Sequence, residues 1–240
     1  MAGDAKRRVP LHFILGGRHM DIDKIASKSS LITPELEEQL LGVLGKLTGE
    51  AHLACVVDLS EKASVEMAEL VRHIASLSDK LSCRFYDSQE AAEALPELDC
   101  TLLPATALYR QGQYTGIAFH GVTGGKEMNS LVLAIYNVAG PGQEMDKRMV
   151  KKLGKLSHKI EIKIFVSLSC HHCAQQVITC QQMAACAEAV EARMIDARLY
   201  PHLAEEYKIE RIPMTIINDR ETLLGTKTLE QMYQYVKSCK

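Results

Sequence analysis

The sequence has almost no net charge and no long apolar run. Its formal net charge is −2 over 240 residues, so no strong electrostatic attraction to nucleic acid is expected. Because no run of 18 apolar residues occurs, no membrane-spanning helix is expected either. The glycine-rich patterns that cradle phosphate groups, GxGxxG and GxxxxGK, are also missing. We therefore expect neither a nucleic acid nor a membrane among the partners of this chain.

No secretory leader is expected. The apolar stretch after Lys6, Arg7 and Arg8 is short and contains Pro10 and His12, and no small-residue cleavage site follows it. Apolar residues make up 47% of the chain and charged residues 24%, which is typical of a globular protein of one or two domains. Most of its eight cysteines are scattered singly through apolar segments, where reduced cysteine behaves as a small hydrophobe. These features favour the reducing cytoplasm.

An internal repeat organises the chain. Shifting the sequence by 109 positions aligns Leu44–Leu47 with Leu153–Leu156, and Leu103–Thr106 with Ile212–Thr215, without a gap. Near the end the offset falls to 98, which implies about eleven extra residues in the first copy. Because the offset is shared over a long stretch, we expect both copies to have the same fold.

The repeat defines the predicted domains. A Gly-Pro-Gly turn at 140–142 separates a first unit, residues 33–142, from a second unit, residues 143–240. Residues 1–32 match neither copy and form an N-terminal extension of unpredicted structure. Each unit shows the pattern helix, strand, helix, strand, short helix, Xaa-Pro, strand and closing helix, which predicts an α/β fold. The main predicted helices are 34–47, 64–77, 127–138, 145–156, 173–186 and 229–238, and the main predicted strands are 53–57, 82–86, 106–109, 160–166, 190–195 and 215–218.

The chemistry of the chain is expected at Cys170 and Cys173. They form the only CxxC, between an apolar strand and a helix. Cys170 is predicted at or near the helix N-terminus, where unpaired N–H groups and the helix dipole favour the thiolate. Cys173 is predicted one turn further in, less exposed and close enough for a disulfide. The intervening His171 and His172 can add hydrogen-bond donors or positive charge near Cys170, so we interpret the motif as a redox-active dithiol.

A metal site is an alternative interpretation of the same four residues. Adjacent residues at a helix start cannot all point at one ion, and a closed zinc site usually combines two separated pairs of ligands. No second CxxC is present, and only His158 and His202 remain as further candidates. A structural disulfide is the other alternative.

Ile212 and Pro213 are expected to complete the site. An Xaa-Pro that opens a strand some 40 residues after a CxxC suggests a cis peptide bond beside the dithiol. Such a bond would turn the Ile212 backbone toward the sulfurs, ready to pair with a substrate strand; an ordinary trans turn is the alternative. The first copy repeats the proline as Pro104, but Glu61 and Ser64 occupy the positions of the two cysteines.

Two thioredoxin-like units, of which only the second carries CxxC, resemble the N-terminal domain of the alkyl hydroperoxide reductase flavoprotein. The resemblance covers about residues 33–240 and is most specific in Ser167–Cys173 and in Asn129–Ala134 with Gly140 after it. It implies two fused thioredoxin-like folds that share an extended mixed sheet flanked by helices. Archaeal-type protein disulfide oxidoreductases have a similar two-unit architecture, but they often carry CxxC in both halves.

The resemblance also implies a function. A thioredoxin-reductase-like flavoprotein would donate electrons to the dithiol, which would pass them to a peroxiredoxin or another disulfide protein. We expect no cofactor in this chain, with FAD and NAD(P)H on the partner, because no Rossmann fingerprint is present. The resemblance suggests that the Glu127 carboxylate faces the dithiol and accepts a proton from Cys173; a helix-start glutamate that complements the dipole is the alternative. A non-catalytic docking or adaptor module of a redox complex is the alternative function.

Overall fold

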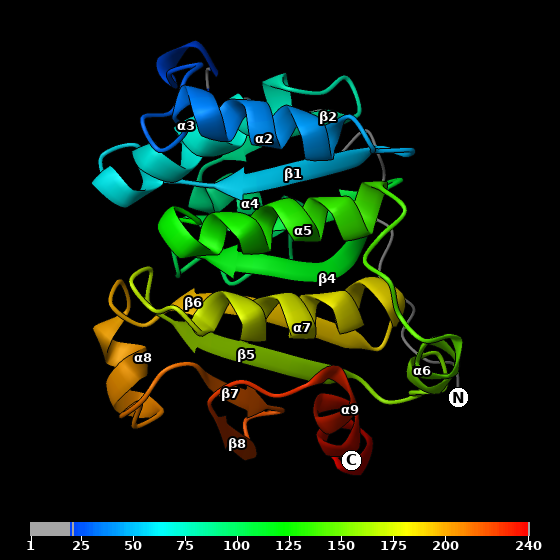
Figure 1. Ribbon diagram of the computed structural model, residues 1–240. Helices are drawn as coiled ribbons and strands as arrows, with labels where there is room; N and C mark the ends of the chain where they lie inside the picture. The colour runs from blue at the N-terminus through cyan, green and yellow to red at the C-terminus, as the bar shows by residue number, and fades with distance from the viewer. Residues whose placement is uncertain (1–19, 21, 240) are drawn as a thin grey trace.

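A single mixed sheet of eight strands forms the centre of the molecule. The computed structural model describes residue 20 and residues 22–239. The strands lie in the order β2-β1-β3-β4-β6-β5-β7-β8, and Figure 1 shows the helices packed across them. The strands are β1 (Ala51–Val56), β2 (Leu81–Tyr86), β3 (Ala105–Arg110), β4 (Gln113–His120), β5 (Ile160–Val166), β6 (Val190–Asp196), β7 (Met214–Ile217) and β8 (Glu221–Leu224).

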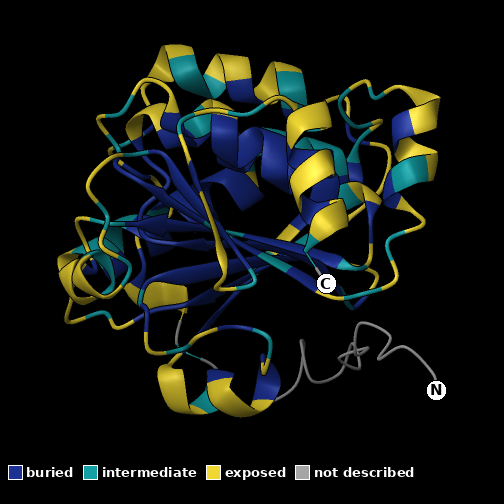
Figure 2. Cartoon of the chain, turned by 90° about the horizontal axis from the view of Figure 1, so that it is seen from below, coloured by how far each residue is buried: buried dark blue, intermediate teal, exposed yellow. Residues whose placement is uncertain are grey.

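Helices cover both faces of this sheet. One face packs the main apolar core against α2 (Pro34–Leu44), α3 (Lys62–Ser76), α5 (Met128–Ala139), α6 (Lys147–Leu153), α7 (Cys173–Cys186) and α9 (Leu229–Ser238). The other face packs two smaller apolar clusters against α4 (Ser88–Ala94) and α8 (Pro201–Glu206). Two short 3-10 helices, η1 (Ile22–Lys24) and η2 (Gly125–Glu127), complete the described elements. Figure 2 shows the buried sheet between exposed outer helix faces. No described helix is long and apolar enough to cross a membrane.

Side chains alternate between the two faces of β5, which lies between β6 and β7 in the sheet. Ile160, Ile162 and Ile164 are fully buried and belong to the main core. The residues between them, Glu161 and Lys163, are only half-buried. Because successive side chains of a strand point to opposite faces, the three isoleucines lie on the face that carries the main core, and Glu161 and Lys163 lie on the other face.

The two halves repeat one order of elements, which confirms the predicted fold. β1 begins at Ala51 and β5 at Ile160, the same offset of 109 that the sequence shows, and β2 and β6 follow it as well. The extra length of the first copy lies in and after β4, which has eight residues where β8 has four. The boundary between the predicted units at residues 142 and 143 stays a prediction, because the sheet runs through both.

The halves are joined by β4 and β6. These strands pair in parallel from Ile117 opposite Ala192 to His120 opposite Ile195. The pairing places the end of β4, and the segment that follows it, beside the end of β6. A segment of the first half is thereby brought to the edge of the sheet where the second half carries its CxxC.

Part of the N-terminal extension belongs to this structure. Ile25 and Ile32 are buried in the main core. The Arg72 guanidinium on α3 donates hydrogen bonds to the carbonyl oxygens of Ile22 and Ile25. Most of the extension, residues 1–19 and 21, lies outside the described residues.

The seam between the halves requires glycine at residue 121. Gly121 has φ +122°, and a Cβ atom there would lie 2.8 Å from the Cβ of Asp196 at the end of β6. We expect Gly121→Ala to lower the free energy of unfolding by about 1–3 kcal/mol through backbone strain and steric overlap. Gly42→Ala is the control, because Gly42 lies in α2 and a Cβ atom there would have no other atom within 4 Å; it should raise that free energy by about 0.5–1 kcal/mol. Urea unfolding measures both, and equal effects would contradict the close approach at the seam.

Candidate functional site

The two cysteines lie where the chain passes from β5 into α7. β5 ends at Val166, and the Cys170 N–H donates to the Ser167 carbonyl oxygen at 2.9 Å in the turn that follows. Cys173 is the first residue of α7, and Cys170 lies three residues before it. The cysteines form a disulfide with a Cα–Cα distance of 5.5 Å. The predicted pairing is therefore present, and Cys170 lies near the helix N-terminus, as expected. Cys173 begins α7 rather than lying one turn inside it.

Exposure distinguishes the two sulfurs. Cys170 is half-buried, whereas Cys173 is 0% exposed. No side chain caps the N-terminus of α7, so its first backbone N–H groups have no side-chain acceptor. Such groups, together with the helix dipole, stabilise a nearby thiolate. The geometry therefore suits Cys170 as the attacking thiolate and Cys173 as the shielded resolving thiol.

The histidines between the cysteines lie at the surface. His172 is the residue before the first turn of α7, and both His171 and His172 are exposed. Their positions allow contact with an incoming partner protein. Their predicted influence on the Cys170 thiolate stays a prediction.

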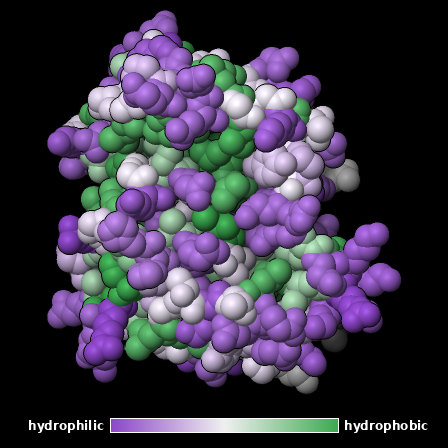
Figure 3. Space-filling model, viewed as in Figure 1, coloured by the Kyte–Doolittle hydropathy of each residue, from purple (hydrophilic) through white to green (hydrophobic). Residues whose placement is uncertain are grey.

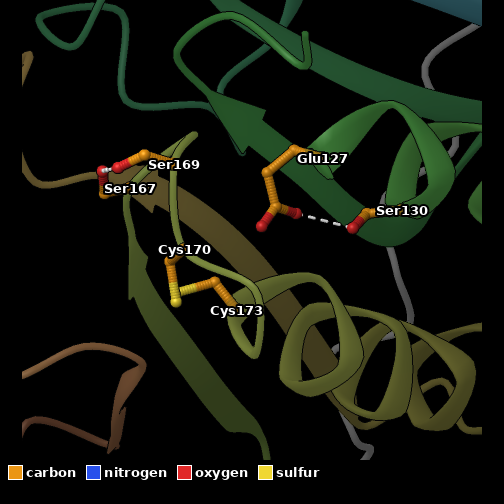
Figure 4. Close-up of a disulfide and its surroundings, with 6 residues drawn as sticks. All are labelled: Glu127, Ser130, Ser167, Ser169, Cys170 and Cys173. Carbon is orange, nitrogen blue, oxygen red and sulfur yellow. Dashed lines mark hydrogen bonds between the residues drawn. A yellow bond between two sulfur atoms is a disulfide. The ribbon is translucent and has the colours of Figure 1, made fainter. Parts of the chain in front are cut away.

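Glu127 of the first half reaches the same site. It ends η2, which lies against α7, and Figure 4 shows its carboxyl group pointing toward the Cys170–Cys173 pair. The side chain is 0% exposed. The Ser130 hydroxyl donates to Glu127 Oε2 at 2.6 Å, and Oε1 has no hydrogen-bond partner among the described residues.

Burial changes the acidity of this carboxyl group. The loss of water raises the pKa of Glu127 to about 7, and the nearby charge of Asp196 adds to the rise, while the hydrogen bond from Ser130 opposes it. A pKa near 7 allows the group both to accept and to release a proton at neutral pH. The alternative interpretation, a helix-start glutamate that complements the dipole, is not decided by this burial, and the role of Glu127 stays a prediction.

The segment that carries Glu127 lies close to two other parts of the chain. Gly125 has φ +56°, and a Cβ atom there would lie 3.4 Å from the Leu168 carbonyl oxygen in the cysteine loop. A Cβ atom at Gly124 would lie 3.3 Å from the side chain of Leu31. Three segments distant in the sequence therefore meet beside the dithiol: the extension, the end of the first half and the cysteine loop. The contact from Leu31 had no signal in the sequence.

Pro213 and Pro104 have the same backbone geometry. The Ile212–Pro213 and Leu103–Pro104 peptide bonds are both cis, which confirms the predicted cis bond. Pro213 is buried, and the half-buried Ile212 packs on the core cluster that contains Cys173. The pairing of the Ile212 backbone with a substrate strand stays a prediction.

The equivalent position of the first half has no thiol. Glu61 is the exposed residue that precedes α3, and Ser64 is buried in its first turn. Neither side chain can exchange electrons with a disulfide. The first half therefore contributes Glu127 to the site and no redox group of its own.

The metal interpretation finds no support in the described part of the chain. No group of three or more His, Cys, Asp and Glu side chains is placed there to hold an ion. His158 lies 3.4 Å from the Val236 carbonyl oxygen, and His202 is exposed on α8. Of the two cysteines further along α7, Cys180 is buried, but Cys186 is exposed because it ends the helix.

The raised pKa of Glu127 predicts a pH dependence of stability. Folding raises the pKa of Glu127 from 4.5 to about 7. Between pH 4.5 and about 7, the Glu127 carboxyl group is therefore protonated in the native protein and ionised in the unfolded chain. The stabilisation should therefore be complete below about pH 4.5 and be lost as the pH rises through about 7, by roughly 3 kcal/mol. Glu127→Gln should abolish this part of the pH dependence, and Glu61→Gln should leave it unchanged. Urea unfolding between pH 4 and 8 checks this, and a decline that persists unchanged in Glu127→Gln would contradict it.

Comparison with known proteins finds a family model, curated relatives and solved structures that are similar to this chain. The sequence model of the thioredoxin domain matches residues 160–237. The alkyl hydroperoxide reductase protein AhpF of Staphylococcus aureus is 26% identical over 202 residues, which cover 84% of this chain and 37% of that protein. A crystal structure of the N-terminal domain of AhpF from Enterococcus faecalis is 35% identical, with a TM-score of 0.80, and the match covers 85% of this chain and 99% of that one.

A more distant structure shares the fold. A protein disulfide oxidoreductase from Aeropyrum pernix has a TM-score of 0.77 at 16% identity, over 92% of this chain and 94% of that one. The chain spans 31% to 37% of the length of the curated relatives that it matches most strongly. On the match to the AhpF domain, the chain belongs to the family of thioredoxin-fold thiol–disulfide oxidoreductases represented by the N-terminal domain of the alkyl hydroperoxide reductase protein AhpF.

Proposed function

We propose that the Cys170–Cys173 pair carries two electrons from a donor protein to the disulfide of an acceptor protein. The observation that supports this most directly is the disulfide at the entrance of α7, with one half-buried and one fully buried cysteine. In the reduced state, the Cys170 thiolate attacks the acceptor disulfide and one acceptor sulfur leaves as a thiolate. The Cys173 thiolate then attacks the Cys170 sulfur of the mixed disulfide and releases the second acceptor sulfur. The acceptor gains two electrons, and the Cys170–Cys173 disulfide forms again.

Glu127 assists the second step in this proposal. Cys173 must lose its proton before it can attack, and it is shielded from water. The Glu127 carboxylate points toward the pair and has one oxygen without a partner among the described residues. With a pKa near 7, it can take the proton from Cys173 at neutral pH.

The relatives suggest the two partners. The AhpF protein of Staphylococcus aureus is named for alkyl hydroperoxide reduction, and a relative from Bacillus subtilis is named an NADH dehydrogenase. We propose that a thioredoxin-reductase-like flavoprotein, with FAD and NAD(P)H, donates the electrons. A peroxiredoxin is the proposed acceptor, within a peroxiredoxin reduction system. Six free cysteines among the described residues are compatible with the reducing cytoplasm as the compartment.

The roles of the two cysteines can be tested by alkylation and trapping. In the reduced protein, we expect iodoacetamide at neutral pH to modify Cys170 faster than Cys186. Cys186 is exposed and Cys170 half-buried, but partial burial of the Cys186 sulfur raises its pKa, whereas Cys170 lies just before the N-terminus of α7. Cys173→Ser should accumulate a mixed disulfide with the acceptor, and Cys170→Ser should form none. Peptide mass spectrometry measures both results.

Two outcomes would overturn this assignment. If Cys170→Ser traps a partner and Cys173→Ser does not, the roles of the cysteines are reversed. If neither variant traps a partner and both keep the parent protein's behaviour, the dithiol takes no part in electron transfer and the chain is a docking or adaptor module.

Substitutions can distinguish the proposed role of Glu127 from any role of the other first-half residues. We expect Glu127→Gln to slow turnover at pH 8 by at least about tenfold, or about 1.4 kcal/mol of transition-state stabilisation. It should also remove the rise in rate through about pH 7 that follows ionisation of Glu127. The control is the double variant Glu61→Ala/Ser64→Ala, which should keep turnover within about tenfold of the parent. A larger loss in this control would show that the first copy takes a further part in the chemistry.

A further inference from the structure

A groove lined by positive charge lies between α6 and α9, away from the dithiol. It is open to solvent and encloses about 560 Å³. One wall consists of Arg148, Lys151, Lys152 and Lys155, and the other of Tyr233, Gln234 and Lys237. Figure 3 shows hydrophilic side chains gathered over α6 at the lower right of the molecule.

The spacing of these residues in the sequence explains why the cations line one side of each wall. On the first wall the cations follow one another at i, i+3, i+4 and i+7, which places them on one side of α6 and the turn after it. On α9, Tyr233 and Lys237 are four residues apart and therefore share a face. The two stretches are about 80 positions apart in the chain and meet only in the fold.

Most of this positive charge has no counterpart within the described structure. Lys152 is paired with Glu230 at 3.1 Å, and its ammonium group lies 5.2 Å from the centre of the Tyr233 ring. The other four cations of the groove make no ion pair with any described residue. By contrast, Lys163 on β5 is paired with Asp219. The chain as a whole has a net charge of −2, so this excess is a local feature.

The groove and the dithiol lie at opposite ends of β5. α6 precedes the start of this strand, and the cysteine loop follows its end, as Figure 1 shows. Seven residues of strand at about 3.3 Å each separate the two ends by roughly 20 Å. A molecule held in the groove therefore leaves Cys170 accessible.

We propose that this groove docks an extended, acidic segment of a protein that exchanges electrons with the dithiol. The inference rests on the proposed function for the identity of the partner, but not for the existence of the site. Four of the five cations are lysines on the surface, which act as mobile point charges rather than as a rigid phosphate cage. Tyr233 is itself buried in the main core, with the Lys152 ammonium over its ring, so the cations provide the recognition surface of the groove.

The position of the groove fits the needs of an electron carrier. Donor and acceptor must both reach Cys170, so neither can occupy the dithiol for long. A segment tethered at the far end of β5 would keep its protein at high effective concentration while the dithiol remains free. Because the attraction is electrostatic and exposed, binding should weaken as salt rises.

A labelled peptide tests the proposal on the full chain. The probe is a fluorescein-labelled peptide with four glutamates, and its counterpart has glutamine in place of glutamate. We expect fluorescence anisotropy to show binding of the acidic peptide alone, weakening with salt. The variant Lys151→Glu/Lys155→Glu/Lys237→Glu should weaken binding at least about tenfold. The matched control, Lys24→Glu/Lys46→Glu/Lys208→Glu, changes the same amount of charge at exposed sites outside the groove and should weaken it less than about threefold.

The outcomes separate this proposal from the proposed function. The proposal is overturned if the acidic peptide does not bind, or if both triple variants weaken binding equally. It is also overturned if a DNA duplex or anionic lipid vesicles bind the groove more tightly than the peptide. Reduction of a small aromatic disulfide should stay unchanged in both variants, because the groove is remote from Cys170. If the parent protein does not reduce the small aromatic disulfide, that result counts against the proposed function. The docking site is then still judged by the peptide-binding result alone.

Discussion

The parallel pairing of β4 with β6 is the constraint on which the site depends. It joins two similar halves into one sheet and brings the segment after β4 beside the cysteine loop. Glu127 belongs to the first half and the dithiol to the second, so neither half contains the complete site. The glycine at residue 121 allows this junction, because a side chain there would overlap Asp196. The first copy has no cysteines at the equivalent position but contributes the Glu127 carboxyl group, for which we propose the role of proton acceptor.

Burial gives the members of the site their different properties. Cys173 and Glu127 are excluded from water, whereas Cys170 is half-buried and the two histidines are exposed. The exclusion of water shields Cys173, and it also raises the pKa of the Glu127 carboxyl group, the proposed proton acceptor. One physical effect, burial, therefore accounts for both the shielding of Cys173 and the raised pKa of Glu127.

Much of this arrangement follows from local sequence, and the remainder depends on contacts between distant segments. The common offset of 109 predicts the order of the elements because both copies retain the same apolar periodicity. The CxxC between a strand and a helix predicts the dithiol, since that position fixes the surroundings of both sulfurs. Glu127 was identified through the family resemblance, because periodicity alone cannot show that a helix-start glutamate is buried against another half. The contact of Leu31 with Gly124 and the exposure of Cys186 had no local signal, because each depends on how whole elements pack.

Reduction of the oxidised protein by an electron donor tests the central claim most directly. The oxidised chain is incubated with NADH or NADPH and a thioredoxin-reductase-like flavoprotein, and thiols are counted by alkylation and mass spectrometry. We predict two new thiols per chain, both in the peptide that contains Cys170 and Cys173, and none without the flavoprotein. No new thiols with any such donor, or new thiols only at other cysteines, would contradict the claim that this disulfide is the electron carrier.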